Sequence, residues 1–171
     1  PTRVGQRTAT TQAGRRTPTP VNTGADLPPG YTFFESETSP FTIGYPEDWD
    51  VLPAFEFGDI KTDVFQGEDL NVNVYGDTSL KALSIETIMT ALIRENEKDD
   101  AQNSERVGEM RVDGKRALLV QWSDGDGAGY MQAVWKTDTH GWVATLYVQD
   151  GDSLDSQVPV FKEILGTFRH K

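Results

Sequence analysis

The chain contains no cysteine among its 171 residues. Disulfides, thiolate zinc sites, iron–sulfur clusters and cysteine nucleophiles are therefore excluded. Histidine is scarce as well, since His140 and His170 are the two that the sequence holds. So few imidazoles leave little material for metal binding or for a catalytic triad. The sequence predicts neither a cofactor nor a resident metal.

Long apolar runs and positive charge are also lacking. No apolar stretch approaches the roughly 18 residues that a membrane-spanning helix needs. The chain has 16 Lys and Arg against 27 Asp and Glu, a formal net charge of −11, which argues against nucleic acid and against anionic lipid as partners. We expect a protein or small-molecule partner, and contact with a membrane only through an anchor upstream of this chain.

The charge divides the chain near residue 30. Residues 1–30 hold four arginines and one aspartate, a net charge of +3, which leaves −14 for residues 31–171. The first part is rich in Thr, Pro and Arg and has too little apolar area to offset about 1–2 kcal/mol of backbone entropy per residue. We expect a flexible basic linker over 1–30 and one folded domain over 31–171. The linker is a plain spacer or, alternatively, its arginines bind phosphate or an acidic partner.

Several segments of the domain have the two-residue periodicity of strands. Residues 70–75 alternate strictly, so their aliphatic side chains share one face and Asn71, Asn73 and Tyr75 share the other. Gly58-Asp59 and Asp113-Gly114 are hairpin turn signals. Strands are expected over 41–45, 51–57, 60–66, 70–75, 105–112, 117–122, 130–135 and 142–148.

Two helices are expected. Ser84 is a good N-cap for a helix whose apolar residues recur at spacings of three and four from Ile85 to Ile93. A shorter helix over 157–166 would have Ser156 as its cap and Pro159 in its first turn. The elements together predict an α+β fold, in which helices flank a central antiparallel sheet as an α/β/α sandwich.

Three stretches resemble the PsbP-like family: FTIGYPEDW at 41–49, VDGKRALLVQW at 112–122 and VFKEILGTFR at 160–169. The resemblance covers about residues 31–171 and includes no catalytic motif. The family contains a photosystem II accessory protein, a Ran-binding nuclear-transport factor and bacterial lipoproteins of the DcrB and LpqN types. The resemblance implies a PsbP-like domain with a role in binding or assembly and without a shared active site.

The loop Asp124 to Gly129 is similar to the start of a calcium-binding loop, since two carboxylates alternate with glycines. With Asp124 at position 1, position 5 is Ala128 and position 12 is Trp135, and neither supplies the required oxygen. We expect a flexible hairpin loop with solvated acids, and weak cation binding at Asp124 and Asp126 as the alternative.

Other candidates for chemistry are weak. Glu95, Glu97, Asp99 and Asp100 are typical of a solvated, solubilising surface. A carboxylate pair can hydrolyse glycosides when one acid has a raised pKa beside a cleft, so a small carboxylate-dependent hydrolase is the alternative function. The sequence has no Gly-x-Ser-x-Gly elbow, and His140 lies in an expected turn. We therefore predict no catalytic residues and no enzyme.

The aromatic residues allow two interpretations. The four tryptophans, Trp49, Trp122, Trp135 and Trp142, lie on or beside expected strands and are predicted to fill the core. A solvent-facing subset would instead form a binding surface. The candidate residues of this surface are Tyr75, Tyr130, Trp135 and Tyr147.

These observations favour a non-catalytic binding or scaffold domain. The basic linker in front of an acidic body without cysteine is typical of a domain displayed outside the cytoplasm on a flexible tether. We expect a periplasmic or cell-surface location, as a lipoprotein or a receptor ectodomain.

Overall fold

A computed structural model describes residues 27–57, 60–98 and 101–171. The predicted Gly58-Asp59 turn, Asp99 and Asp100, and residues 1–26 of the predicted linker lie outside the described residues. Leu27 already lies against the domain, because a Cβ on Gly44 would come within 2.6 Å of its Cδ2.

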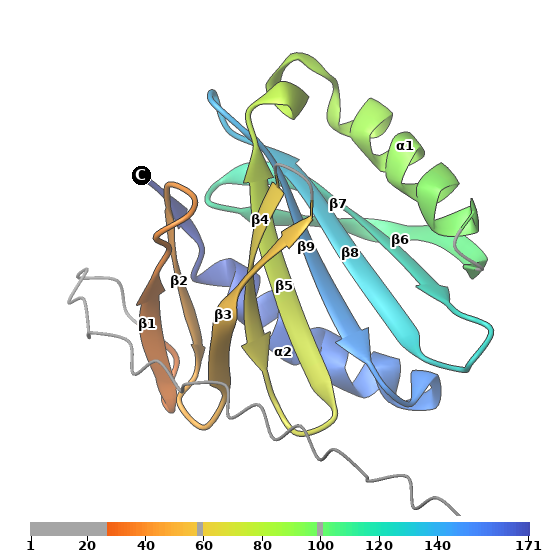
Figure 1. The fold of residues 1–171 in the computed structure, drawn as a ribbon, viewed down its shortest axis with the longest axis horizontal. Coiled ribbons are helices and arrows are strands. Elements are labelled where there is room, and N and C mark those ends of the chain that lie inside the picture. Colours follow the sequence, from red (N-terminus) through yellow and green to blue (C-terminus); the bar gives the residue numbers. More distant parts are fainter. Residues whose placement is uncertain (1–26, 58–59, 99–100) are drawn as a thin grey trace, which may run out of the picture.

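Two antiparallel sheets form the domain (Figure 1). In the larger sheet the strand order is β3-β4-β5-β9-β8-β7-β6, so two meanders meet where β5 pairs with β9. The predicted antiparallel meander from residue 105 onward is confirmed. The strands are β3 (Asp50–Phe57), β4 (Ile60–Gln66), β5 (Leu70–Asp77), β6 (Gln102–Val112), β7 (Lys115–Ser123), β8 (Gly129–Lys136) and β9 (Gly141–Val148).

A smaller sheet has the order β1-β2-β10, with β1 at Tyr31–Glu35, β2 at Phe41–Pro46 and β10 at Arg169–His170. The sequence predicts β2 but neither of its neighbours. The β1 sequence YTFFE lacks strict alternation, and a two-residue strand is too short to have a period. Both strands exist because β2 offers its backbone groups on both sides.

The helices cover opposite faces of the larger sheet. α1 (Ile85–Lys98) packs on β6, β7 and β8, while α2 (Leu154–Gly166) lies behind the sheet on the side that also carries β2 (Figure 1). Short 3₁₀ turns, η1 (Ser79–Ala82) and η2 (Gly151–Ser153), precede them. The predicted α+β class, a central antiparallel sheet between helices, is confirmed.

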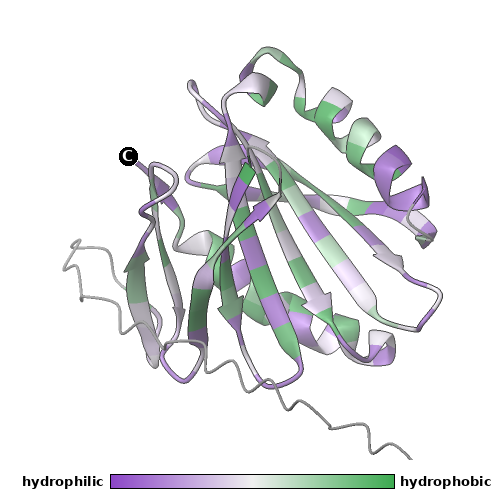
Figure 2. Ribbon diagram, in the orientation of Figure 1, coloured by the Kyte–Doolittle hydropathy of each residue, from purple (hydrophilic) through white to green (hydrophobic). Residues whose placement is uncertain are grey.

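Alternation along the strands divides the core into two layers. The α2 side contains the larger cluster, including Trp135, Trp142 and Phe168, and the α1 side contains Ile88, Met89 and their neighbours. Figure 2 shows the alternating hydrophobic and hydrophilic residues along β5. The predicted core position of the tryptophans is confirmed, since Trp122, Trp135 and Trp142 are buried and Trp49 packs against the core in a partly buried position.

Local sequence signals predict the start of α1 correctly and the start of α2 incorrectly. The backbone N–H of Thr87 donates to the Ser84 hydroxyl at 3.0 Å, as expected of an N-cap. The prediction for α2 is wrong at its start, because the helix begins at Leu154 and places Pro159 beyond the first turn. Burial of Leu154 and Phe161 outweighs the helix hydrogen bond that proline removes.

Candidate functional site

Of the four predicted surface residues, the structure places the three tyrosines on the α1 side of the larger sheet and Trp135 on the α2 side. Tyr75 and Tyr130 pack partly buried against the α1-side core, and Tyr147 pairs with Tyr130 across β8 and β9. Trp135 is fully buried in the α2-side core, so the alternative interpretation that includes it in a solvent-facing surface is wrong. The cause is parity, since a strand residue next to Val134, which faces α1, must point to the opposite side.

The three tyrosines belong to a larger half-exposed area on the α1 side of β5, β9 and β8. Because α1 packs on β6, β7 and β8, the same face of β5 and β9 extends beyond the helix. Strand pairing places Asn71 opposite Tyr147 and Asn73 opposite Thr145. We call this area the tyrosine patch, defined by Asn71, Asn73, Tyr75, Tyr130, Thr145 and Tyr147.

An aromatic row crosses three strands at one end of the patch. Trp122 and Tyr130 stack with ring centroids 4.9 Å apart and an interplanar angle of 6°. Tyr130 and Tyr147 meet edge to face with centroids 5.3 Å apart. Ring contacts therefore connect the three side chains, and the half-exposed Tyr147 forms the end of the row on β9.

Asp124 anchors this row. One carboxylate oxygen accepts from the backbone N–H groups of Asp126 and Ala128 at 3.0 and 2.9 Å, and the other accepts from the Tyr130 hydroxyl at 2.8 Å. The Tyr130 hydrogen bond, supported by the backbone donors, lowers the pKa of Asp124, and burial together with Asp124 raises the pKa of Tyr130. The expectation of simply solvated acids is wrong for Asp124, whose side chain holds the hairpin together.

The polar centre of the patch contains both satisfied and unsatisfied groups. Gln132, which is 8% exposed, accepts from the Asn96 amide of α1 at 3.3 Å and donates to the Thr145 hydroxyl at 3.2 Å. The buried Oδ1 atoms of Asn71 and Asn73 have no hydrogen-bond partner. Such acceptors cost about 1–3 kcal/mol each. The sequence prediction did not include Asn71 and Asn73, although the alternation of β5 already places them on the face of Tyr75.

The pKa of Tyr75 in the patch is raised by burial. Burial, and then the nearby Asp77 carboxylate, raises the pKa of Tyr75 to about 12. The phenol is therefore neutral at physiological pH and serves as a hydrogen-bonding, amphipathic surface.

A buried carboxylate lies elsewhere, between β4 and the β1–β2 turn. Asp63 is 4% exposed and accepts from the hydroxyls of Ser36 at 2.6 Å and Thr38 at 3.1 Å. Burial raises the pKa of Asp63 more than these hydrogen bonds lower it. The Ser36 hydroxyl also accepts from the backbone N–H groups of Thr38 and Ser39, so the cluster ties a turn to the sheet.

The two histidines meet although 30 residues separate them. The hydroxyl of Thr139 lies 2.8 Å from His140 Nδ1 and 2.9 Å from His170 Nε2, and both rings lie against Trp142. Burial, and then His170, lowers the pKa of His140. Across the described ranges, no group of three or more His, Asp or Glu side chains has the arrangement of a metal site.

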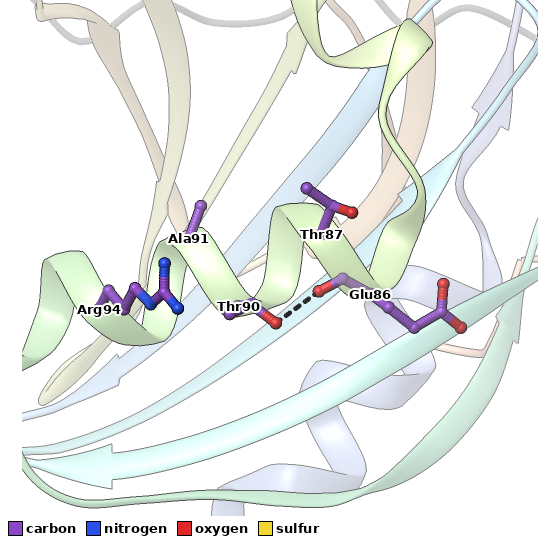
Figure 3. A pocket seen from close by; sticks show the side chains of 5 residues that line it. All are labelled: Glu86, Thr87, Thr90, Ala91 and Arg94. Atoms are coloured by element: carbon purple, nitrogen blue, oxygen red, sulfur yellow. Dashed lines mark hydrogen bonds between the residues drawn. The ribbon is translucent and has the colours of Figure 1, made fainter.

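An open depression of about 320 Å³ lies along α1 and is lined by Glu86, Thr87, Thr90, Ala91 and Arg94 (Figure 3). Its acid, Glu86, pairs with Arg116 at 2.6 Å, and that pairing lowers the pKa of Glu86. A general acid for glycoside hydrolysis needs a raised pKa. Nothing at this depression favours the hydrolase alternative.

Comparison with known proteins identifies the fold. No protein-family model and no curated protein matches the chain. The solution structure of PsbP from the cyanobacterium Synechocystis matches 83% of this chain and 93% of its own, with a TM-score of 0.55 at 13% identity. The chain has a PsbP-like fold. The predicted family resemblance is thus confirmed at the level of the fold.

Two further solved structures have lower TM-scores. A Pseudomonas aeruginosa protein of unknown function covers 82% of this chain and 97% of its own at 13% identity and a TM-score of 0.48. LpqN, involved in cell envelope biogenesis of Mycobacterium tuberculosis, covers 88% of both chains at 11% identity and a TM-score of 0.38. Within residues 27–57, 60–98 and 101–171, no helix is long and apolar enough to cross a membrane.

Proposed function

We propose that this PsbP-like domain is a non-catalytic binding module that docks a partner through the tyrosine patch. The observation that carries the proposal is the patch itself, where three tyrosines lie half-exposed together with Asn71, Asn73 and Thr145 on the α1 side of β5, β9 and β8. Aromatic side chains gathered half-exposed on one face of a sheet are typical of a surface that a partner covers. The sequence resemblance to a family with roles in binding and assembly supports the same proposal.

The proposed location is outside the cytoplasm, with the basic segment at the start of the chain acting as a tether from a membrane anchor. The contrast between a net charge of +3 over residues 1–30 and −14 over residues 31–171 supports a basic tether in front of a separate acidic domain. The partner is a protein or a small molecule. The proposal assigns no metal, cofactor or nucleic acid to the domain.

Site-specific photo-crosslinking tests the docking surface. Gln66 is exposed and pairs directly with Asn71 of the patch, whereas Lys162 is exposed on α2. A photoreactive phenylalanine analogue at position 66 of the full-length protein in its host should form one defined adduct, which Tyr147→Ala should abolish. The same analogue at position 162 should not form this adduct. Equal adducts at both positions, or an adduct at 66 that survives Tyr147→Ala, would overturn the assignment of the patch.

The absence of cysteine makes the location easy to test. Lys162→Cys introduces a single thiol at an exposed position in a chain that has none. A membrane-impermeant thiol reagent should label this variant in intact cells if the domain is outside the cytoplasm. Labelling that appears only after lysis would overturn the proposed location.

A further inference from the structure

We infer that the tyrosine patch binds an extended lysine- and arginine-rich segment of a partner protein. The inference rests on the proposed function and adds the chemical class of the partner. It follows from the charge beside the patch, the half-exposed aromatic ring of Tyr147 within it, and the length of the aromatic row.

The patch borders a line of carboxylates at one end of the sheet. The β4–β5, β7–β8 and β9–α2 connections meet there, since the Gln149 N–H donates to the Asp69 carbonyl at 3.0 Å and the Gly151 N–H donates to the Gly127 carbonyl at 2.8 Å. Tyr130 and Tyr147 lie one residue inside this end, beside the terminal pair of Gly129 and Val148. We call the line the acidic edge, defined by Glu68, Asp69, Asp124, Asp126, Asp150 and Asp152.

No basic residue lies nearby in the sequence to balance the acidic edge. Residues 62–80, 117–135 and 137–161 contain neither lysine nor arginine, and they include all of β5 and β9 and nearly all of β8. In the part of the chain that the structure describes, no lysine or arginine forms an ion pair with Glu68, Asp69 or Asp126. The acidic edge therefore produces a negative potential that attracts cations to the patch.

The patch itself offers what a lysine or arginine side chain binds. Tyr147 presents a half-exposed ring, and aromatic faces attract guanidinium and ammonium groups. The Oδ1 atoms of Asn71 and Asn73 are buried beneath the surface of the patch, so recognition of a basic side chain depends on Tyr147 and on the carboxylates of the acidic edge. The carboxylates of the acidic edge would repel an acidic segment, and a purely apolar segment would gain nothing from them.

The row from Trp122 through Tyr130 and Tyr147 to Asn71 crosses four hydrogen-bonded strands. Three inter-strand spacings span roughly 14 Å, which corresponds to about four residues of an extended chain. A segment lying along this row runs parallel to the acidic edge, so successive basic side chains reach either the carboxylates or the ring of Tyr147.

The test titrates the full chain with a short synthetic peptide in which arginine and lysine alternate with serine. Calorimetry should detect binding that weakens as salt rises, and amide NMR shifts should concentrate on the tyrosine patch. Glu68→Gln/Asp126→Asn should weaken binding about fivefold, since exposed ion pairs contribute about 0.2–1 kcal/mol each. Tyr147→Leu should weaken it about threefold and Tyr147→Phe should not.

Glu56→Gln/Asp138→Asn is the matched control, because it removes the same two charges from exposed positions at the opposite end of the sheet. This control should change the affinity less than twofold. Equal loss in both double variants, shifts outside the patch, or no binding at low salt would overturn the inference. Tighter peptide binding in Arg15→Gln/Arg16→Gln would assign the patch to the chain's own basic segment and would also overturn it. An adduct at position 66 that depends on Tyr147 would still support the proposed function in each case.

Discussion

At the scale of single residues, the polar side chains on the α1 side of the sheet differ in whether they have partners. Thr145 accepts the Gln132 amide at 3.2 Å, whereas the Oδ1 of Asn73, directly opposite on β5, has no partner. The two side chains are neighbours on one face of the sheet, but the Thr145 hydroxyl forms a hydrogen bond and the Asn73 Oδ1 does not. Substitution by valine, which removes the polar atoms and favours strands, should therefore have opposite effects at the two sites.

Asn73→Val should leave the free energy of unfolding unchanged or raise it by up to about 1 kcal/mol, because it removes an unpaired acceptor. Thr145→Val should lower it by about 1–3 kcal/mol, because the buried Gln132 amide loses its acceptor. Urea denaturation of the two variants measures the difference. A loss for Asn73→Val as large as that for Thr145→Val would mean that the Asn73 amide is satisfied.

The buried Asp63 predicts a pH dependence. Its pKa is raised in the folded state, so the folded protein holds the proton more strongly than the unfolded chain does. The stability from this group is full below the usual aspartate pKa and is lost as pH rises through the raised value. Asp63→Asn lacks this loss and keeps an acceptor for Ser36 and Thr38.

The free energy of unfolding of Asp63→Asn, relative to the wild type, should therefore increase between pH 4 and pH 7. Urea denaturation at the two pH values measures this change. A relative stability of Asp63→Asn that falls with rising pH would contradict the raised pKa.

The residue types in the sequence could predict which side chains are buried, but not which side chains form hydrogen bonds with one another. The sequence predicts Trp49, Trp122, Trp135 and Trp142 in the core because large aromatics beside strands pack inward, and the structure agrees. The sequence fails in the alternative that groups Trp135 with Tyr130 on one solvent-facing surface, because residues five positions apart on one strand point to opposite faces. It also misses the role of Asp124, since the bond to Tyr130 depends on the geometry of a loop.

At the scale of elements, close approach between strands restricts residue size. Gly76 of β5 lies opposite Trp142 of β9, and a Cβ on Gly76 would come within 2.6 Å of the indole ring. Trp142 is fully buried and cannot move without disturbing the core. The glycine is thus a packing requirement of the junction between the two meanders.

Gly76→Ala should lower the free energy of unfolding by about 1–3 kcal/mol through overpacking. Gly166→Ala is the matched control, because a Cβ there meets nothing within 4 Å at the end of α2. This control should be neutral or stabilising by up to about 1 kcal/mol, since alanine favours helix. Thermal and urea denaturation distinguish the two, and equal effects would show that the contact with Trp142 relaxes at little cost.

Periodicity could predict the elements with strong local signals. The turn at Asp113-Gly114 has the positive φ angles of 50° and 72° that a tight hairpin needs, and the sequence predicts it from the Asp-Gly pair. Other elements depend on distant partners. β1 and β10 form because β2 lies between them, and α2 begins early because Leu154 is buried, and neither cause is visible within a short window of sequence.

At the scale of the whole molecule, the sequence predicts the class but not the arrangement of the strands. Hairpin signals indicate which neighbours pair, whereas the contact between β5 and β9 joins segments about 70 residues apart. That contact creates the tyrosine patch, because it places Asn71 and Asn73 beside Tyr147 and Thr145. The candidate site therefore follows from topology, and the sequence identifies only its tyrosines.

The tyrosines also make the whole domain sensitive to alkaline pH. Burial raises the pKa of Tyr31, Tyr45, Tyr75 and Tyr130, and that of Tyr75 reaches about 12 from an ordinary 10. A phenol with a raised pKa stabilises the fold fully below pH 10, and this stability is lost as pH rises through the folded value. For Tyr75 the loss amounts to about 2 kcal/mol.

The wild type should therefore lose more stability than Tyr75→Phe between pH 9 and pH 11.5, as measured by urea denaturation at each pH. Absorbance titration of tyrosinate should show one fewer late-ionising phenol in the variant. Identical pH profiles for the two proteins would mean that Tyr75 ionises like a solvated phenol and that the patch around it is open to water.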